Sequence, residues 1–503
     1  MSRMLKHHYF HKTVAIACIL ATNPVWAESK DRDTLSVEIE MSGTVSNGKY
    51  APMWTTANRF GMSGNKNKNG YLSAEVEYSR ELKHSWRINA GVELAAGLNT
   101  VSDVWIQQAY WDISWKCLNL SIGSKERYGF PLEKNRLLTG GWMVEGPNAR
   151  PIPQVRAEIY EFTDIPYTNG WLALKGHLAY GCFTDNAWQK DFAAAGRSYT
   201  QNSMYHSKSL MFRIGKKEVL PVDFEFGLLM VTQFAGDMYT KQKDGSSELV
   251  TDMPDGLGAY WAAFFPTAGG EDTPAGEQVN VEGNMLGSWN FALNCYLGDW
   301  KVRATLDHYF EDHSQMFWQY GRWKDGQLGI EVYLPRNRWV SAVVWEGMST
   351  KDSSGPVLYD SFAGSFTDIQ WSCGDDYFNN YLYQAWHHYG QGMGHGMIPG
   401  PAYNNDGSIT FKSNRTKMQH LGISGNPTDE WSWRVLATYS RHWGTYYVPF
   451  DNIKKQFCGM AEVSYSPECL KHWDFKIAVA MDRGTYPGNS TGAMMTVRYK
   501  FSK

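Results

Sequence analysis

The sequence lacks the features that mark several large classes of protein. After its N-terminal segment it has no run of 18 or more apolar residues, which excludes an ordinary helical membrane protein. It has no excess of one charge either, because 48 basic and 51 acidic side chains give a formal net charge of −3 over 503 residues. Nucleic-acid-binding proteins carry a basic excess, so no nucleic-acid partner is expected.

Cysteine is scarce and the common catalytic motifs are missing. The seven Cys include no C-x-x-C pair, so the sequence indicates neither a zinc site nor a redox motif, and the cysteines are expected to be small apolar residues on strands. No G-x-S-x-G, H-E-x-x-H or P-loop motif occurs. Residue types for a catalytic triad are present, but nothing in the sequence brings them together. We therefore expect no enzyme activity, no cofactor and no metal.

One histidine group needs separate treatment. His387, His388 and His395 lie in a glycine-rich stretch downstream of Asp375 and Asp376. Imidazole clusters can bind metals, but this spacing fits no standard site. The expectation is a solvated or saccharide-contacting loop.

Aromatic residues and glycine are abundant. The chain contains 22 Trp, 29 Tyr and 23 Phe, which is 15% of its residues, and 48 Gly. Its mean hydropathy of −0.45 looks soluble. Strands of a membrane β-barrel alternate apolar and polar residues and also leave the mean hydropathy low, so the two candidates are a large all-β soluble protein and a membrane barrel. This length usually means several domains, but a large barrel can use it as one.

The first 27 residues have the pattern of a secretory signal peptide. Arg3, Lys6 and Lys12 precede a mostly apolar stretch over residues 13–27. Small residues at Val25 and Ala27 predict cleavage before Glu28. The expected domains are therefore a leader, 1–27, and one barrel domain, 28–503, in the outer membrane of a Gram-negative bacterium.

Alternation with a period of two runs through the rest of the chain. In residues 493–501 Ala, Met, Val, Tyr and Phe alternate with Met, Thr, Arg and Lys, which fits a strand with one face to lipid and one to a wet lumen. The same pattern and the turn signals predict 18 strands. They are 35–45, 71–79, 85–97, 104–115, 117–124, 153–162, 171–183, 208–216, 222–234, 286–297, 300–310, 327–334, 338–346, 411–421, 431–441, 457–466, 473–481 and 492–501.

The connections between these strands alternate between short and long. Short connections such as 80–85 and 298–300 take turns with long ones such as 125–152 and 347–410. Bacterial barrels have short periplasmic turns and long extracellular loops, and an even strand number places both termini in the periplasm. Closing the barrel also removes the edge strands, because 35–45 can pair with 492–501. Two alternatives stay open: residues 377–389 could form a nineteenth strand, although we place them in the largest loop, and segments 235–285 and 347–410 could hold short helices or fold inward as a plug.

Two loops suggest a class of ligand. Loop 311–326 and loop 442–456 place aromatic rings beside basic side chains. Flat rings can stack on sugars and Arg can bind carboxylates with two hydrogen bonds, so an acidic polysaccharide is a suitable ligand. The alternative is that several of these rings belong to the membrane-interface girdle. The predicted binding residues are Trp318, Tyr320, Arg322, Trp323, Lys324, Trp443 and Tyr446.

Several stretches, in order, resemble one protein family. They are residues 140–155, 205–210, 399–404, 413–415, 420–422 and 443–446. With these the sequence resembles the Wzi-type capsule assembly family of outer-membrane proteins, in its Bacteroides-like form. The resemblance implies an 18-stranded barrel and a surface lectin that holds capsular polysaccharide. Enteric members carry an N-terminal helical bundle that plugs the barrel, whereas here only about seven residues separate Glu28 from the first strand, so any occlusion must come from the long loops.

The leading hypothesis is a non-enzymatic outer-membrane barrel that binds and organises surface polysaccharide. Its expected partners are that polysaccharide, outer-membrane lipid and the barrel assembly machinery. The alternatives are a channel for saccharides or small solutes, since eighteen strands can enclose a wet lumen, and an outer-membrane hydrolase.

Overall fold

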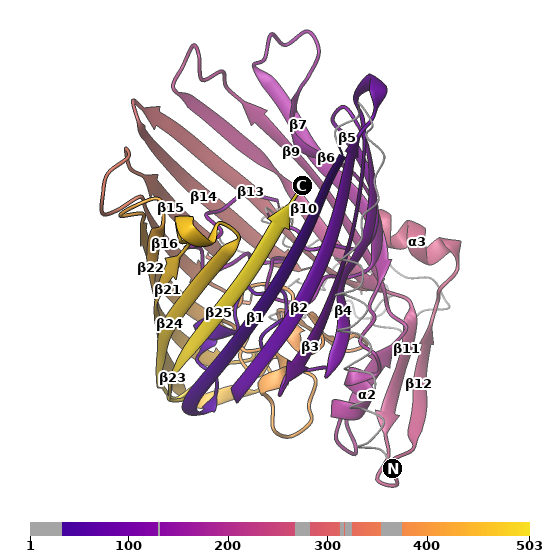
Figure 1. Cartoon of the computed structure of the whole chain (residues 1–503). Coiled ribbons are helices and arrows are strands. Elements are labelled where there is room, and N and C mark those ends of the chain that lie inside the picture. Colours follow the sequence, from indigo (N-terminus) through magenta and orange to yellow (C-terminus); the bar gives the residue numbers. More distant parts are fainter. Residues whose placement is uncertain (1–32, 129–130, 267–281, 312–315, 317–323, 354–374) are drawn as a thin grey trace.

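The chain forms a closed antiparallel β-barrel (Figure 1). The computed structural model describes residues 33–128, 131–266, 282–311, 316, 324–353 and 375–503. Each barrel strand pairs with the next one along the chain, and the last strand pairs with the first over the register Ser36↔Ser502 to Ser46↔Gly492. The predicted fold class and the 18-stranded sheet are confirmed.

The barrel strands have the following bounds. They are β1 (Asp33–Tyr50), β2 (Lys66–Glu81), β3 (Trp86–Leu98), β4 (Val104–Trp115), β5 (Leu118–Ser124), β6 (Gln154–Asp164), β7 (Leu172–Cys182), β9 (Met204–Ile214), β10 (Val222–Phe234), β13 (Asn284–Leu297), β14 (Trp300–Glu311), β15 (Gly326–Tyr333), β16 (Ala342–Ser349), β21 (Thr416–Gly425), β22 (Trp431–Gly444), β23 (Pro449–Tyr465), β24 (Trp473–Gly484) and β25 (Ser490–Ser502).

The remaining elements lie in the connections. The short strands are β8 (Ser198–Gln201), β11 (Gly236–Lys241), β12 (Ser247–Met253), β17 (Asn379–Asn380), β18 (Gln384–Ala385), β19 (His387–His388) and β20 (Gln391–Gly392). The helices are η1 (Met53–Thr55), η2 (Lys83–Ser85), α2 (Trp188–Phe192), α3 (Leu257–Phe264), η4 (Pro401–Tyr403) and η5 (Glu468–Leu470). None of the helices in the described ranges is long and apolar enough to cross a membrane.

All 18 predicted strands are present, but several bounds differ. β21 begins at Thr416 instead of 411, and β16 begins at Ala342 instead of 338. β1, β2 and β23 run beyond their predicted ends into polar segments, and β23 starts at Pro449 instead of 457. The apolar alternation marks only the part of a strand that faces an apolar medium, so polar extensions beyond that part carry no such signal.

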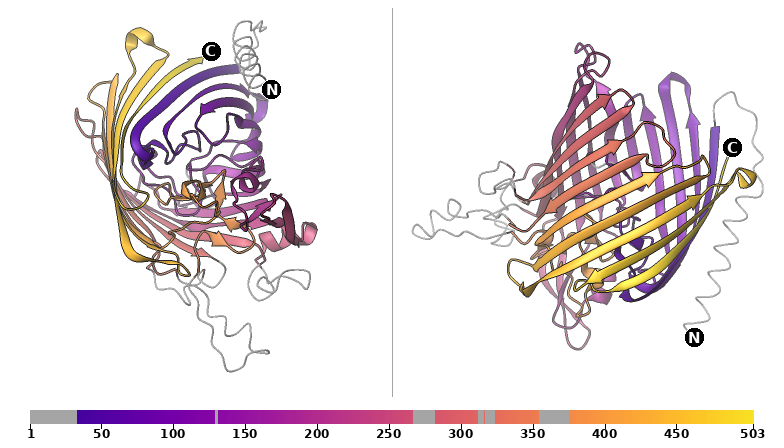
Figure 2. Two further views of the ribbon diagram at one scale, coloured as in Figure 1. Left: turned by 90° about the horizontal axis from the view of Figure 1, so that it is seen from below. Right: turned by 90° about the vertical axis from the view of Figure 1, so that its left-hand side faces the viewer.

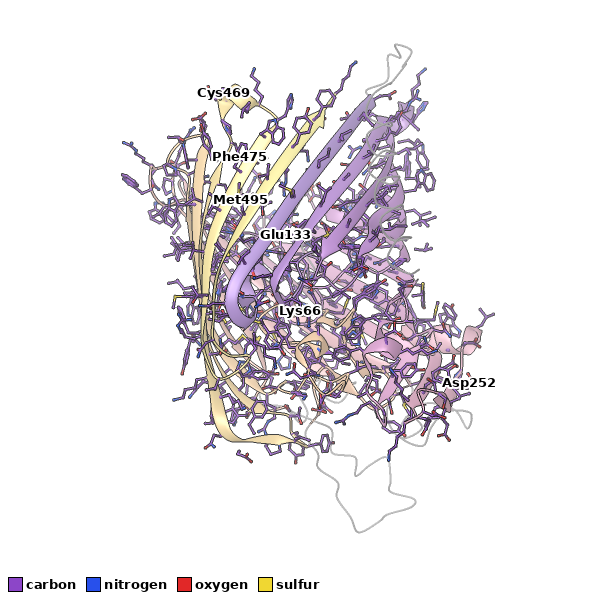
Figure 3. All side chains as sticks on the ribbon, turned by 60° about the horizontal axis from the view of Figure 1, so that its bottom comes forward. Lys66, Glu133, Asp252, Cys469, Phe475 and Met495 are labelled. Carbon is purple, nitrogen blue, oxygen red and sulfur yellow. The ribbon has the colours of Figure 1, made fainter. Side chains whose placement is uncertain are left out.

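The two faces of the wall differ as the alternation predicts. Met41, Ile477 and Met495 point outward and are exposed, whereas Ser42, Thr496 and Ala478 point inward and are buried. Figure 3 shows side chains on both faces, with Phe475 and Met495 on β24 and β25. An exposed apolar outer surface of this extent requires an apolar surrounding medium, which supports a membrane location.

The connections follow the predicted alternation. Leu35 and Lys503 exchange backbone hydrogen bonds of 2.9 Å, so the two ends of the described wall meet at the short-turn end, at the top of Figure 1. The long connections gather at the opposite end. Residues 377–389 hold only two-residue strands outside the wall sheet, which confirms their place in the largest loop. Loop 442–456 was predicted too long, because β22 and β23 leave only residues 445–448 between them.

Candidate functional site

Three long connections fold into the barrel and fill part of its lumen. We call residues 51–65, 131–153 and 375–415 the plug. Seen along the barrel, these segments lie inside the ring of wall strands (Figure 2). Residues of the plug share one hydrophobic core with inward-facing wall residues such as Leu229, Val344 and Met460. One of the two possibilities left open for segment 347–410 is therefore correct for its described part, which folds inward.

Polar contacts fix the plug to the wall on several strands. The Lys134 ammonium lies 2.7 Å from the Asp307 carboxylate of β14 and also donates to Gln327 of β15 at 3.1 Å. On β16, Glu346 accepts from the Thr139 hydroxyl and the Gly140 N–H, both at 2.6 Å. Charge-assisted hydrogen bonds of this kind are stronger than neutral ones, and here they join residues 173 to 207 positions apart.

Hydrogen bonds also join the three plug segments to one another. The Trp386 indole donates to the Val144 carbonyl at 2.7 Å, and the Asn148 amide donates to the Gly392 carbonyl at 2.8 Å. Gly394 packs so tightly that a Cβ there would lie 2.3 Å from the Met143 carbonyl oxygen, so only glycine fits. The plug is therefore a packed body with specific contacts.

The expectation for the three histidines was wrong. His387, His388 and His395 are buried in the plug instead of lying in a solvated loop. The His388 ring bonds the Arg150 carbonyl at 2.8 Å, and the His387 ring accepts from the Gly390 N–H at 3.0 Å. Burial lowers the pKa of His387 and His395 to about 3 and that of His388 to about 4. In the described ranges no three His, Cys, Asp or Glu residues are placed to hold a metal ion.

Two charged cavities lie beside residues 126–128 and 133–137, toward the short-turn end; we call them the vestibules. The first, of about 370 Å³, is lined by carboxylates and cations that include Glu40 and Arg498, whose charged atoms are 2.7 Å apart. The second, of about 260 Å³, contains Arg303, which binds Glu225 through two hydrogen bonds of 2.9 Å. Glu40 and Arg498 pair across the neighbouring strands β1 and β25, whereas Glu225 on β10 and Arg303 on β14 pair across the intervening strand β13.

The structure describes only three of the predicted binding residues. Trp318, Tyr320, Arg322 and Trp323 lie outside the described residues. Lys324 is exposed, with its ammonium 4.0 Å from Asp352. Trp443 and Tyr446 were both assigned to a loop.

Trp443 and Tyr446 in fact belong to a tight hairpin at the long-connection end. Trp443 is half-buried on β22, and Lys351 and Arg441 each lie over its ring, at 5.5 and 5.4 Å from the centroid. Tyr446 is 45% exposed in the turn after β22 and contacts the exposed Tyr447 ring edge-on. We call residues 443–448 the hairpin tip.

Sequence reasoning missed two cations beside the hairpin tip, Lys351 and Arg441. Lys351 follows the wall strand β16 and Arg441 lies on β22, where strand prediction assigns them no function. Both cations follow the outward-facing residues of their strand at its long-connection end, and this position was the sequence signal that could have identified them. The free cysteines Cys117, Cys182, Cys295 and Cys458 lie on or beside wall strands, whereas Cys469 lies in a turn.

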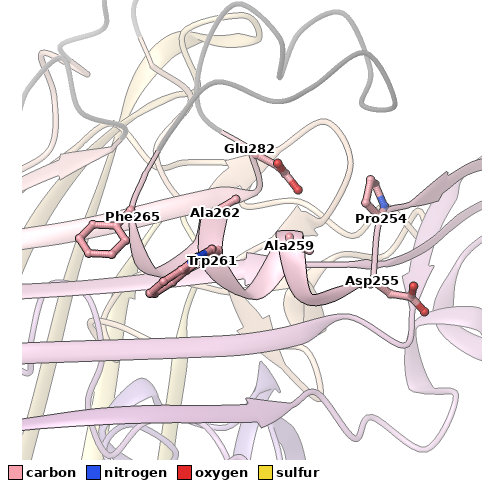
Figure 4. Close-up of a pocket in the computed structure, with 9 residues that line it drawn as sticks. Pro254, Asp255, Ala259, Trp261, Ala262, Phe265 and Glu282 are labelled. Carbon is pink, nitrogen blue, oxygen red and sulfur yellow. The ribbon is translucent and has the colours of Figure 1, made fainter.

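Helix α3 lies against the outside of the wall. It contacts β9 and β10, and the Lys208 ammonium of β9 bonds the Phe264 carbonyl at its C-terminal end. Ala259 and Ala263 face the wall, whereas Leu257, Trp261 and Phe265 are exposed. Figure 4 shows Trp261 and Phe265 at the hollow of about 640 Å³ beside this helix. This apolar face adds to the apolar outer surface of the barrel.

Comparison with known proteins identifies the fold. No family model and no curated protein sequence matches the chain. Among solved structures it is similar to Wzi from Escherichia coli, described as a carbohydrate-binding β-barrel of the outer membrane involved in group 1 capsule assembly. That match has a TM-score of 0.56 and 12% identity over 92% of this chain and 84% of Wzi.

Two matches from Pseudomonas aeruginosa are more distant. OccK5 (OpdH) has a TM-score of 0.47 and 7% identity, over 94% of this chain and 98% of its own. The outer membrane protein opdK has a TM-score of 0.45 and 9% identity, over 94% of this chain and 99% of its own. The likeness to Wzi shows that the chain has the fold of an outer-membrane β-barrel.

Proposed function

We propose that this chain is a non-enzymatic outer-membrane barrel that binds and organises capsular or other surface polysaccharide, as the Wzi-type resemblance implies. The observation that carries the proposal is the plug. A lumen partly filled by a core of plug and wall residues leaves the long-connection end as the place where a large ligand can meet the protein. The fold shared with a carbohydrate-binding barrel supports the same function.

The chemistry of the hairpin tip suits an acidic polysaccharide. Tyr446 and Tyr447 present two exposed rings at 84° to each other, so a chain of sugars could stack on one while contacting the edge of the other. Lys351 lies over the Trp443 ring and Lys454 over the Phe450 ring, so positive charge for carboxylates also lies at the same hairpin. Trp318, Tyr320, Arg322, Trp323 and Lys324 remain predicted members of the same binding surface.

The test is binding of the purified full-length barrel to capsular polysaccharide from the producing strain. Replacing Tyr446 and Tyr447 by Ala should weaken binding by about tenfold, because each stacked ring contributes about 0.5–1.5 kcal/mol. A matched control replaces Tyr167 and Trp339, two exposed rings in connections at the short-turn end. Undiminished binding would remove the hairpin tip from the site, and failure to bind any surface glycan would reject the lectin function.

The vestibules favour a second candidate, a conduit for saccharides or small solutes. Their mixed charges could guide a polar solute if the plug moved. Planar-bilayer recordings separate the two functions. A steady conductance through the wild-type protein would support transport, whereas a closed barrel that binds glycan would support the lectin.

The same proposal includes export and maturation. Residues 1–27 lie outside the described residues, so removal of the leader before Glu28 and a single barrel domain over 28–503 stay predictions. N-terminal sequencing of the protein from outer membranes should read from Glu28.

A further inference from the structure

Three basic side chains form a row on the outer wall, near the long-connection end. Lys417 of β21 lies directly opposite Arg441 of β22, and Arg441 lies directly opposite Lys455 of β23. All three are exposed, and they have the same parity as the outward-facing Tyr439 and Phe457. Directly opposite residues in an antiparallel sheet have Cα atoms only about 4.5–5.5 Å apart. We call these residues the basic row.

The basic row has no counter-charge within the described residues. No carboxylate of that part of the chain lies within 4.0 Å of Lys417, Arg441 or Lys455. Like charges directly opposite each other destabilise a sheet, and the basic row contains two such pairs. Arg434 and Glu462, by contrast, face each other across β22 and β23 as an opposite-charge pair at 2.8 Å. An anion from outside the chain would remove the repulsion.

A hollow of about 670 Å³ lies beside the basic row. Lys324 and the three basic residues line it together with Leu328, Trp345 and Tyr439. Outward-facing Gly347 contributes no side chain, and a Cβ there would come within 3.2 Å of the Gln419 amide, so the hollow is kept open. Its one acidic lining residue, Asp325, is buried and accepts hydrogen bonds from the Tyr377 hydroxyl and the Asp352 N–H.

The side chains next to the row change from charged to apolar toward the middle of the wall. The next outward-facing positions are Gln419, Tyr439 and Phe457, which oppose one another in register. Beyond them come Trp345 and Leu421, also opposite each other and exposed. Cations next to aromatic rings and then aliphatic residues match the order of headgroup, interface and hydrocarbon in a bilayer.

We propose that the basic row and its hollow bind the phosphorylated headgroup of an outer-leaflet glycolipid, lipid A in a Gram-negative outer membrane. The cations take the phosphates, and Trp345, Leu328 and Tyr439 contact the sugar and the first carbons of the acyl chains. The site faces away from the lumen and opens onto the apolar belt, so a membrane lipid reaches it more directly than a soluble glycan. The inference does not depend on polysaccharide binding by the hairpin tip.

The test compares the full-length barrel in detergent with a variant that carries Lys417→Gln, Arg441→Gln and Lys455→Gln. A control variant carries Lys217→Gln, Arg336→Gln and Lys471→Gln, which removes the same charge from the short-turn end. The probes are bisphosphorylated lipid A and the same lipid with both phosphates removed. Each cation near an anionic lipid raises the affinity by on the order of tenfold or less. Loss of all three cations should therefore weaken the binding of bisphosphorylated lipid A by about a hundredfold.

Thermal unfolding gives a second readout that also detects misfolding. Without lipid, the first variant should melt at or above the wild-type temperature because the repulsion is gone. With bisphosphorylated lipid A, the wild type and the control should gain stability and the first variant should not. Equal binding of bisphosphorylated lipid A by the first variant and the wild type, or equal binding of the dephosphorylated lipid by the wild type, would each overturn the proposal.

Discussion

Replacing Lys134 by Met should loosen the plug without unfolding the barrel. The Lys134 and Asp307 side chains are only 1% and 3% exposed, and their charged atoms are 2.7 Å apart. The ammonium also donates to the Gly141 carbonyl and the Gln327 amide oxygen, both at 3.1 Å, so it holds the plug against β14 and β15 together. Methionine keeps most of the volume but removes the charge and every one of these hydrogen bonds.

The size of the effect on plug opening depends on the Asp307 carboxylate, which the substitution leaves in place. The substitution leaves the Asp307 carboxylate buried without its cation, and breaking a buried pair in this way costs about 3–5 kcal/mol. The packed state of the plug is destabilised by this free energy. In the opened state water reaches Asp307, so that state is destabilised little. Opening should therefore become about 140 to 3,700 times more frequent, at about 1.4 kcal/mol for each factor of ten.

Hydrogen exchange measures this opening directly. The Gly140 amide donates to Glu346 of the wall strand β16 at 2.6 Å, and the Gly146 amide donates to the Met393 carbonyl of the plug at 3.0 Å. Their exchange should accelerate by about the factor given above, while amides in the middle of β24 and β25 should keep the wild-type rate. A conductance step in planar bilayers would report the same opening as flow through the lumen.

A double variant separates the electrostatic cause from a packing defect. Lys134→Met combined with Asp307→Leu removes both charges, and replacing a buried pair by apolar residues is often neutral or stabilising. Its plug amides should exchange close to the wild-type rate. The reasoning fails if Lys134→Met exchanges like the wild type, or if the double variant exchanges as fast as the single one.

Two further predictions concern the histidines and helix α3. Burial holds the pKa values of His387, His388 and His395 at about 3, 4 and 3, so at a pH between these values and 6.5 the opened plug binds protons that the packed plug excludes. The free energy that keeps the plug packed should be at its maximum above pH 6.5 and should fall on acidification, by about 2 kcal/mol per ring at pH 5. Hydrogen-exchange rates of the plug amides, corrected for the intrinsic pH dependence of exchange, would contradict this if they stayed constant from pH 7 to 5. The second prediction is that α3 lies in the membrane interface. A nitroxide spin label attached at Trp261→Cys, in a chain without its native cysteines, should then collide more with oxygen than with a water-soluble nickel chelate. A label at Tyr381→Cys, where the native side chain is exposed, should collide more with the nickel chelate.

Strand positions could be predicted because each strand obeys a local rule. On β25, Met495 and Val497 face out while Arg498 faces in beside Glu40, as the alternation of residue types requires. Closure followed from the even strand number and the need to pair the edges of β1 and β25. One kind of error arose where a strand extends beyond the apolar belt, as at Pro449, because the alternation stops there and the hydrogen-bond ladder does not. The other kind arose at β16 and β21, which begin four and five residues later than predicted.

The plug could not be predicted in this way because long-range contacts create it. Nothing near His395 in the sequence shows that it will be buried, and Trp386 finds its partner Val144 at a separation of 242 residues. The polar and glycine-rich composition that predicts a solvated loop also suits a segment whose backbone packs against other backbone, as at Gly394. Composition alone does not separate these two cases.

The residues behind the family resemblance gain a physical meaning from the plug. Stretches 140–155, 399–404 and 413–415 lie in the plug or continue it directly into β6. His420, in another stretch, donates a hydrogen bond of 2.6 Å from its ring to the Leu138 carbonyl of the plug. A lipid-facing strand position accepts many apolar residues, so barrel walls of one shape can share little sequence. A plug position must satisfy one carbonyl, one carboxylate or one close backbone contact, which restricts the residue far more. The stretches that carry the resemblance are therefore concentrated in the part of the molecule that closes the lumen.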